Sequence, residues 1–144
     1  MKKIISIFTL IILCSISYGQ DQKEEFTIVE NMPIFKGCEK KKTQSKRDQC
    51  TNVELYKFIV KNVRYPKDLF GQGLSGTTYV TFRVDTTGKV IDERIEGKFP
   101  GESGYKFDEE ALKVVRQIPT MTPGMTKGEP QAVQYTIPVR FSEK

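Results

Sequence analysis

The sequence predicts an α+β fold in which two helices pack on one face of a three-stranded antiparallel sheet. Two segments carry apolar residues at helical spacing, two others alternate cleanly between opposite faces, and a third strand segment, residues 90–95, is less cleanly patterned. Their order along the chain is helix, hairpin, helix, strand. Packing both helices on the same face of the sheet would bury every apolar stripe of these segments.

The first helix is predicted from Thr51, because Thr51 and Glu54 have the spacing of a capping box. Pro66 ends it, since the residue before a proline disfavours helical backbone angles. The apolar residues expected to face the core from this helix are Val53, Tyr56, Val60 and Val63.

A hairpin follows the first helix. Residues 77–85 alternate with period two, which predicts a half-buried strand, and residues 90–95 predict the returning strand. Between them, Asp85 to Gly88 predict a tight turn in which Gly88 supplies a positive φ angle. The side chains expected on the buried face of the first strand are Thr78, Val80, Phe82 and Val84.

The second helix is predicted over residues 108–118, with Asp108 to Glu110 in its first turn, where the helix dipole favours acidic side chains. A loop rich in proline and glycine, residues 120–130, leads to the last strand. The residues expected inside are Ala111, Leu112, Val115 and Ile118 of the helix and Val133, Tyr135, Ile137, Val139 and Phe141 of the strand, which has Gln134, Thr136, Pro138 and Arg140 on its other face.

The N-terminus predicts a signal peptide cleaved near Gly19. Lys2 and Lys3 precede a ten-residue run, 4–13, that is apolar except for Ser6 and Thr9, and Ser17 and Gly19 provide the small residues of a cleavage site. Ten residues rise only about 15 Å as a helix, half the thickness of a bilayer core. An uncleaved anchor and lipid attachment at Cys14 are the two alternatives.

Charge and cysteines limit the classes of function. The chain has a net charge of +5, but after cleavage its excess positive charge lies in residues 39–49, so a broad nucleic-acid-binding face is excluded. This basic loop is either solvated or in contact with an anionic surface. Cys38 and Cys50 predict a disulfide in an exported chain, and two thiols without any histidine exclude a zinc site.

The sequence predicts no catalysis and no cofactor. It has no histidine, its two mature cysteines are expected to be paired, and no serine lies in a G-x-S-x-G motif. The glycines around Gly73 lack the Gly-Lys-Ser/Thr of a phosphate-binding loop.

The most specific signal is a spaced series of motifs. It consists of Y-P-x-x-L-x-x-x-G-x-x-G at residues 65–76, V-x-F-x-V-D-x-x-G-x-V at 80–90, P-G at 123–124 and G-x-P at 128–130. Over residues 53–141 this series resembles the C-terminal domain of TonB, the energy transducer of outer-membrane transport. Residues 32–38 are similar to the lead-in of Bacteroidetes-type members. Leu69 and Met121 depart from the usual alanine and tryptophan of the family, and both stay apolar.

The resemblance implies a peptide-binding function, and together with the signal peptide and the cysteine pair it divides the chain into three units. The predicted units are a signal peptide at 1–19, an N-terminal extension with the disulfide-bracketed basic loop at 20–52 and a TonB C-terminal-like domain at 53–144. In the family, the last strand offers its free edge to an extended segment of a transporter, the TonB box. Carried over to this chain, the peptide-binding residues are Asn62, Arg64, Tyr65, Val133, Gln134, Tyr135, Thr136, Ile137, Val139 and Arg140.

The expected function is therefore a non-catalytic periplasmic module that binds an outer-membrane TonB-dependent transporter or a related envelope protein. Two alternatives are an anchored transducer that couples the proton motive force to transport, and a structural envelope module that contacts peptidoglycan through its lysines. A homodimer is left open, and no nucleic acid is expected as a partner.

Overall fold

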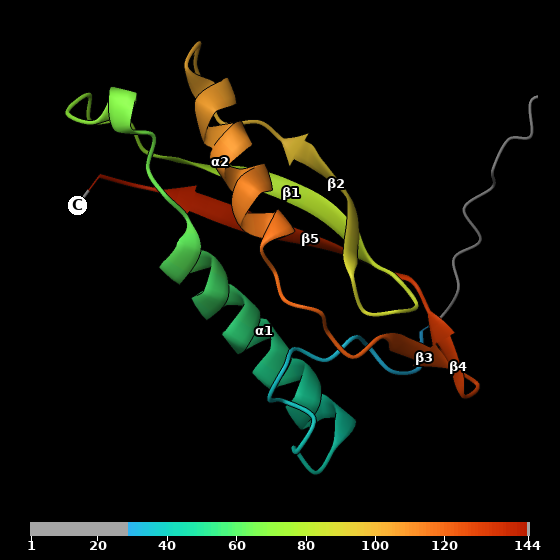
Figure 1. Cartoon of the computed structure of the whole chain (residues 1–144). Helices are drawn as coiled ribbons and strands as arrows, with labels where there is room; N and C mark the ends of the chain where they lie inside the picture. Colours follow the sequence, from blue (N-terminus) through green and yellow to red (C-terminus); the bar gives the residue numbers. More distant parts are fainter. Residues whose placement is uncertain (1–28, 144) are drawn as a thin grey trace, which may run out of the picture.

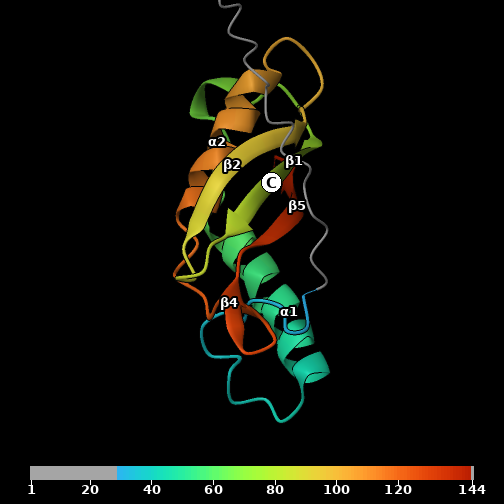
Figure 2. The ribbon, with the colours of Figure 1, turned by 90° about the vertical axis from the view of Figure 1, so that its right-hand side faces the viewer.

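The computed structural model of the chain describes residues 29–143. Its three-stranded sheet has β1 (Gly76–Val84) in the centre, with β2 (Val90–Gly97) and β5 (Val133–Phe141) antiparallel on either side. Two helices, α1 (Gln44–Asn62) and α2 (Gly104–Arg116), contribute buried side chains to the core on one face of this sheet. Figures 1 and 2 show α2 beside β1 and β2, and α1 running diagonally past β5. The predicted α+β fold is confirmed.

The sheet has the alternation that the sequence predicts. On β1, the side chains of Thr78, Val80, Phe82 and Val84 are fully buried. On β5, Val133, Val139 and Phe141 are buried, Tyr135 and Ile137 half-buried, and the intervening side chains exposed. The rings of Phe82 and Tyr135 stack across the two strands, with their centroids 5.6 Å apart.

Helix α1 differs from its prediction in both start and orientation. It begins at Gln44, where the hydroxyl of Thr43 accepts a hydrogen bond from the Lys46 N–H. Thr51 lies in the middle of the helix, and its buried hydroxyl accepts from the Phe35 N–H at 3.0 Å, so the predicted capping box is wrong. The buried stripe is Thr51, Leu55 and Ile59, whereas the predicted core residues Val53, Tyr56 and Val60 are 46%, 62% and 55% exposed.

Helix α2 begins at Gly104, four residues before its predicted start, so Asp108 to Glu110 do not lie in its first turn. Asp108 has a different role. Its buried carboxylate accepts hydrogen bonds from the Thr78 hydroxyl at 2.8 Å and from the Phe99 N–H at 2.9 Å. It thereby joins α2 to the central strand and to the loop after β2.

The loop at residues 120–130 contains a small hairpin that the sequence did not predict, formed by β3 (Gly124–Thr126) and β4 (Glu129–Gln131). The N-terminal segment pairs with this region through isolated bridges from Asn31 to Met125 and from Ile34 to Thr122. The predicted turn before β2 is confirmed: Gly88 has a φ of +84°, and its carbonyl accepts from the Met121 N–H at 2.9 Å.

Cys38 and Cys50 form the predicted disulfide, which ties the N-terminal segment to α1. The two cysteines are 12 residues apart in the sequence. Closing a loop of this size should stabilise the fold by about 3 kcal/mol, because it restricts the unfolded chain. We expect reduction by dithiothreitol to lower the melting temperature by about 10 °C, measured by circular dichroism. The Cys38→Ser/Cys50→Ser variant is the control and should not respond to reductant. Two titratable thiols in the untreated protein would contradict the pairing.

The predicted signal peptide lies outside the described residues. Among residues 29–143, no helix is long and apolar enough to cross a membrane.

Candidate functional site

Strand β5 has one open edge. Within the described part of the chain, β1 is its only paired neighbour. The pairing runs without interruption from Gly76 opposite Phe141 to Val84 opposite Val133. A regular edge strand presents a row of N–H and C=O groups that another chain can pair with.

The opposite edge of the sheet, β2, is less suited to pairing. Its register with β1 shifts at two places, and Asp92 has a φ of +54°. Bulges and charged side chains are common devices that protect a sheet edge. Charged residues occupy half of this strand, and Arg83 and Arg116 pair with Asp92 and Glu93.

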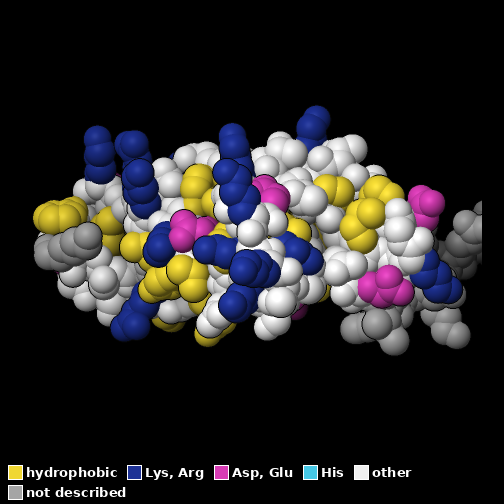
Figure 3. Space-filling model, turned by 90° about the horizontal axis from the view of Figure 1, so that it is seen from below, with side chains coloured by type: hydrophobic (Ala, Val, Ile, Leu, Met, Phe, Trp, Pro, Cys, Tyr) yellow, Lys and Arg dark blue, Asp and Glu magenta, His cyan; other side chains and the backbone are white. Residues whose placement is uncertain are grey.

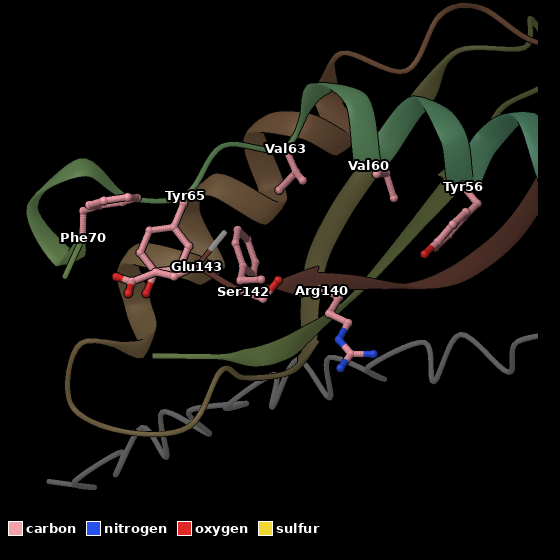
Figure 4. A pocket seen from close by; sticks show the side chains of 9 residues that line it. Tyr56, Val60, Val63, Tyr65, Phe70, Arg140, Ser142 and Glu143 are labelled. Carbon is pink, nitrogen blue, oxygen red and sulfur yellow. The ribbon is translucent and has the colours of Figure 1, made fainter. Parts of the chain in front are cut away.

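A groove runs between the open edge of β5 and helix α1, and we call it the α1–β5 groove. It consists of two adjoining hollows of about 400 and 250 Å³ that share Tyr56. The first is lined by Tyr56, Val60, Val63, Tyr65, Phe70, Arg140, Phe141, Ser142 and Glu143. The second is lined by Asn52, Leu55, Tyr56, Ile59, Tyr135, Thr136, Ile137 and Pro138. Figure 4 shows the side chains of Tyr56, Val60 and Val63 pointing from α1 toward the strand.

The wall of the groove exposes several large apolar side chains. Tyr56 and Val60 are more than half exposed, and Phe70 is 67% exposed. Large apolar side chains that gather in a surface groove mark an interaction site more often than scattered ones do. The α1–β5 groove therefore combines free backbone groups on one side with apolar side chains on the other.

The end of the groove is held by Tyr65 and Glu143. The Tyr65 hydroxyl donates to the Leu74 carbonyl at 2.9 Å, and its ring meets that of Phe107 edge-on at 5.1 Å. The Glu143 carboxylate accepts from the N–H groups of Gly71 and Gly73 at 2.5 and 3.2 Å. Burial, and next the charge of Glu143, raise the pKa of Tyr65, so its ring remains a neutral phenol that can donate a hydrogen bond.

The structure brings half of the ten predicted site residues to this groove. Tyr65, Tyr135, Thr136, Ile137 and Arg140 line it, and Figure 4 shows the Arg140 side chain pointing away from α1. Burial also raises the pKa of Tyr135, whose hydroxyl donates to the Pro33 carbonyl at 3.3 Å.

The remaining predicted residues lie elsewhere. Val133 and Val139 are buried in the core, and the Gln134 side chain is exposed at the start of β5. Asn62 donates to the Phe58 carbonyl at 2.8 Å, within its own helix, and Arg64 is exposed in the turn after α1. Neither Asn62 nor Arg64 lines the hollows.

Sequence reasoning missed the helical wall of the groove. Tyr56 and Val60 have helical spacing, but it assigned them to the core. Phe70 and Glu143 belong to irregular segments, where no period marks a role. Among residues 29–143, no group of three or more His, Cys, Asp or Glu side chains could hold a metal ion.

Comparisons with known proteins bear on the same region. A family model described as Gram-negative bacterial TonB protein C-terminal matches residues 61–142. The NMR solution structure of Helicobacter pylori TonB-CTD (residues 194–285) is 20% identical, covering 63% of this chain and 91% of that chain with a TM-score of 0.49. The corresponding structure of residues 179–285 is also 20% identical, covering 65% and 80% with a TM-score of 0.47. No curated protein matches the chain.

Proposed function

The chain belongs to the family of Gram-negative bacterial TonB protein C-terminal domains, and from that premise we propose that it is a non-catalytic periplasmic module that binds an extended peptide of an outer-membrane transporter by strand addition to β5. The observation that carries the proposal is the open, regular edge of β5 facing an apolar helical wall. In this binding mode, main-chain hydrogen bonds supply affinity and pockets for alternate side chains supply selection.

Pro138 indicates which backbone groups of β5 face the open edge. A proline is tolerated in a strand where its missing N–H would point away from the sheet. Because residues of an antiparallel pair alternate in direction and the register is unbroken, the N–H groups of Thr136 and Arg140 point outward with it. An added strand would therefore meet no N–H donor of β5 at Pro138, but it would meet one at Thr136 and another at Arg140.

The side chains of an added strand would alternate between the helix and the solvent. Those on the helix side would contact Tyr56, Val60 and Phe70, which are exposed in the free domain. We therefore expect selection for aliphatic or aromatic residues at every second position. Burial of one such side chain stabilises a complex by about 1.5–3 kcal/mol before the entropy of ordering the peptide is counted.

The test removes one outward N–H from β5. Thr136→Pro should weaken the binding of a transporter peptide at least tenfold, because it deletes a backbone donor at the centre of the open edge. Binding is measured by isothermal titration calorimetry with synthetic peptides from the N-terminal segments of outer-membrane transporters. Circular dichroism must first show that the variant is folded.

The matched control is Thr136→Val. It removes the same hydroxyl, which lies 2.7 Å from that of Thr81, but keeps the N–H, so peptide binding should stay within about threefold. A folded Thr136→Pro variant that binds as the natural protein does would refute strand addition at β5. If the natural protein binds no transporter peptide even at high micromolar concentration, the structural envelope module becomes the better hypothesis.

The periplasmic location belongs to the same proposal. The family acts in the periplasm, and the predicted signal peptide accounts for export. N-terminal sequencing of the fractionated protein should find Gln20 at its start. Retention of residues 1–19 in the membrane fraction would instead support the anchored transducer.

A further inference from the structure

Four exposed lysines form a lysine cluster at the N-terminal end of α1: Lys40, Lys41, Lys42 and Lys46. None of them is paired with a carboxylate among the described residues. Residues 36–50 hold six basic and two acidic side chains, whereas the rest of residues 29–143 hold 13 of each. The whole excess charge of the described chain, +4, therefore lies in this one segment.

The lysine cluster is built on a fixed frame. The disulfide joins the two ends of the segment, and the Arg47 guanidinium donates to the Lys41 carbonyl at 3.1 Å. The two carboxylates of the segment are engaged locally: that of Glu39 accepts from the Gly37 N–H at 2.8 Å and that of Asp48 from the Gln44 side chain at 2.6 Å. Strand addition at β5 does not involve this cluster.

The lysine cluster is continuous with the α1–β5 groove along one exposed stripe of α1. Side chains three or four residues apart share a helix face, and this stripe reads Lys46, Gln49, Val53, Tyr56 and Val60. A shallow hollow at its basic end is lined by Lys41, Lys46, Gln49, Cys50, Val53 and Glu54, and Tyr56 and Val60 line the groove at the other end. The Glu54 carboxylate is paired with Lys57. Figure 3 shows basic side chains gathered on this face next to hydrophobic ones.

We propose that the peptide that adds to β5 carries an acidic segment, which the lysine cluster binds. This inference rests on the proposed function and specifies its partner. The distance sets the spacing: the ten residues from Lys46 to Tyr56 rise about 15 Å in a helix, which an extended peptide crosses in about five residues. The acidic residues therefore lie about five residues beyond the part of the peptide that contacts Tyr56.

The composition of the lysine cluster fits carboxylates on a flexible chain. Lysine ammonium groups act as mobile point charges, whereas planar arginines suit bidentate recognition of phosphate, and the segment's single arginine is used on its own backbone. Val53 is half exposed between the lysines and the groove, so the peptide's apolar contact continues along the stripe. Charge complementarity of this kind mainly raises the association rate and depends on salt.

The test compares three synthetic peptides that share one groove-binding core. One has neutral flanks, one has three glutamates about five residues before the core, and one has them about five residues after it. At low salt, one of the two acidic peptides should bind about tenfold more tightly than the neutral one, measured by fluorescence anisotropy. The side that gains reveals the direction of the peptide, and the gain should disappear near 0.5 M NaCl.

Matched charge variants separate the lysine cluster from net charge. Lys40→Gln/Lys41→Gln/Lys46→Gln should abolish the gain and leave binding of the neutral peptide unchanged. Lys89→Gln/Lys98→Gln/Lys127→Gln removes the same charge elsewhere and should keep the gain. If the acidic and neutral peptides bind equally, the inference is overturned while the proposed function stands, and if no peptide binds, both are wrong. A gain that survives in the cluster variant, or is lost equally in both variants, also overturns it.

Discussion

Replacing Gly88 with alanine is expected to lower the free energy of unfolding by about 4 kcal/mol, through backbone strain and forced displacement of the chain. Gly88 has a φ of +84°, and an added Cβ would stand 1.8 Å from the Met121 carbonyl oxygen. Because the Gly88 carbonyl also accepts from the Met121 N–H, moving the turn breaks the link between the β1–β2 hairpin and the segment after α2. Urea unfolding followed by circular dichroism measures the loss.

Gly101→Ala is the control for this prediction. Gly101 has a similar φ of +91° but nothing within 4 Å of its added Cβ. The free energy of unfolding of Gly101→Ala should therefore fall by only about 1–2 kcal/mol, which is the cost of left-handed backbone angles for a residue with a Cβ. Equal losses in the two variants would show that the contact with Met121 has no energetic weight.

Phe107→Ala should cost a similar amount, about 4 kcal/mol, because it leaves a cavity in the centre of the core. The Phe107 ring is fully buried and contacts those of Phe99, Phe141 and Tyr65. Since Tyr65 lines the α1–β5 groove, we also expect weaker peptide binding. Thermal unfolding and calorimetry measure the two effects, and Phe107→Leu serves if the alanine variant does not fold.

Phe70→Ala isolates the groove from the core. Phe70 meets the same Tyr65 ring edge-on, at 6.2 Å, but is 67% exposed. Its loss should change stability by no more than about 0.5 kcal/mol and still weaken peptide binding. A large loss of stability with unchanged binding would assign Phe70 to the core and contradict its place in the groove wall.

Most of the sheet could be predicted from the sequence because the apolar side chains of β1 and β5 gather on one face of each strand. Alternation on β1 and β5 identifies both the strands and the sides on which Val80 and Val139 lie. The orientation of α1 could not be predicted in the same way, since it carries two apolar stripes. The one that is buried was chosen by tertiary contacts, among them the hydrogen bond from the Phe35 N–H to the Thr51 hydroxyl.

The candidate site likewise has one part that could be predicted from the sequence and one part that could not. The open edge at β5 follows from the strand order and the family resemblance, so Thr136 and Arg140 could be predicted from the sequence. The opposite wall depends on the α1 stripe that is left exposed and on Phe70 in an irregular segment. Asp108 illustrates a third case: a position near a helix start suggests a dipole role, and only the fold brings Thr78 and Phe99 to its carboxylate.

The disulfide provides a covalent path for any mechanical tension that reaches the domain from its N-terminal side. A pull arriving from the N-terminal side first loads the contacts that hold residues 30–34 to residues 122–127, which are two isolated bridges and the hydrogen bond from the Lys127 N–H to the Glu30 carboxylate. At Cys38 the load passes through a covalent bond to Cys50 in the second turn of α1, and the chain between them stays slack. The force then reaches the helix that forms one wall of the α1–β5 groove. Force on a peptide strand bound to β5 would therefore be transmitted by the contacts between α1 and the sheet, which would be loaded in shear. The loop between Cys38 and Cys50 would not extend.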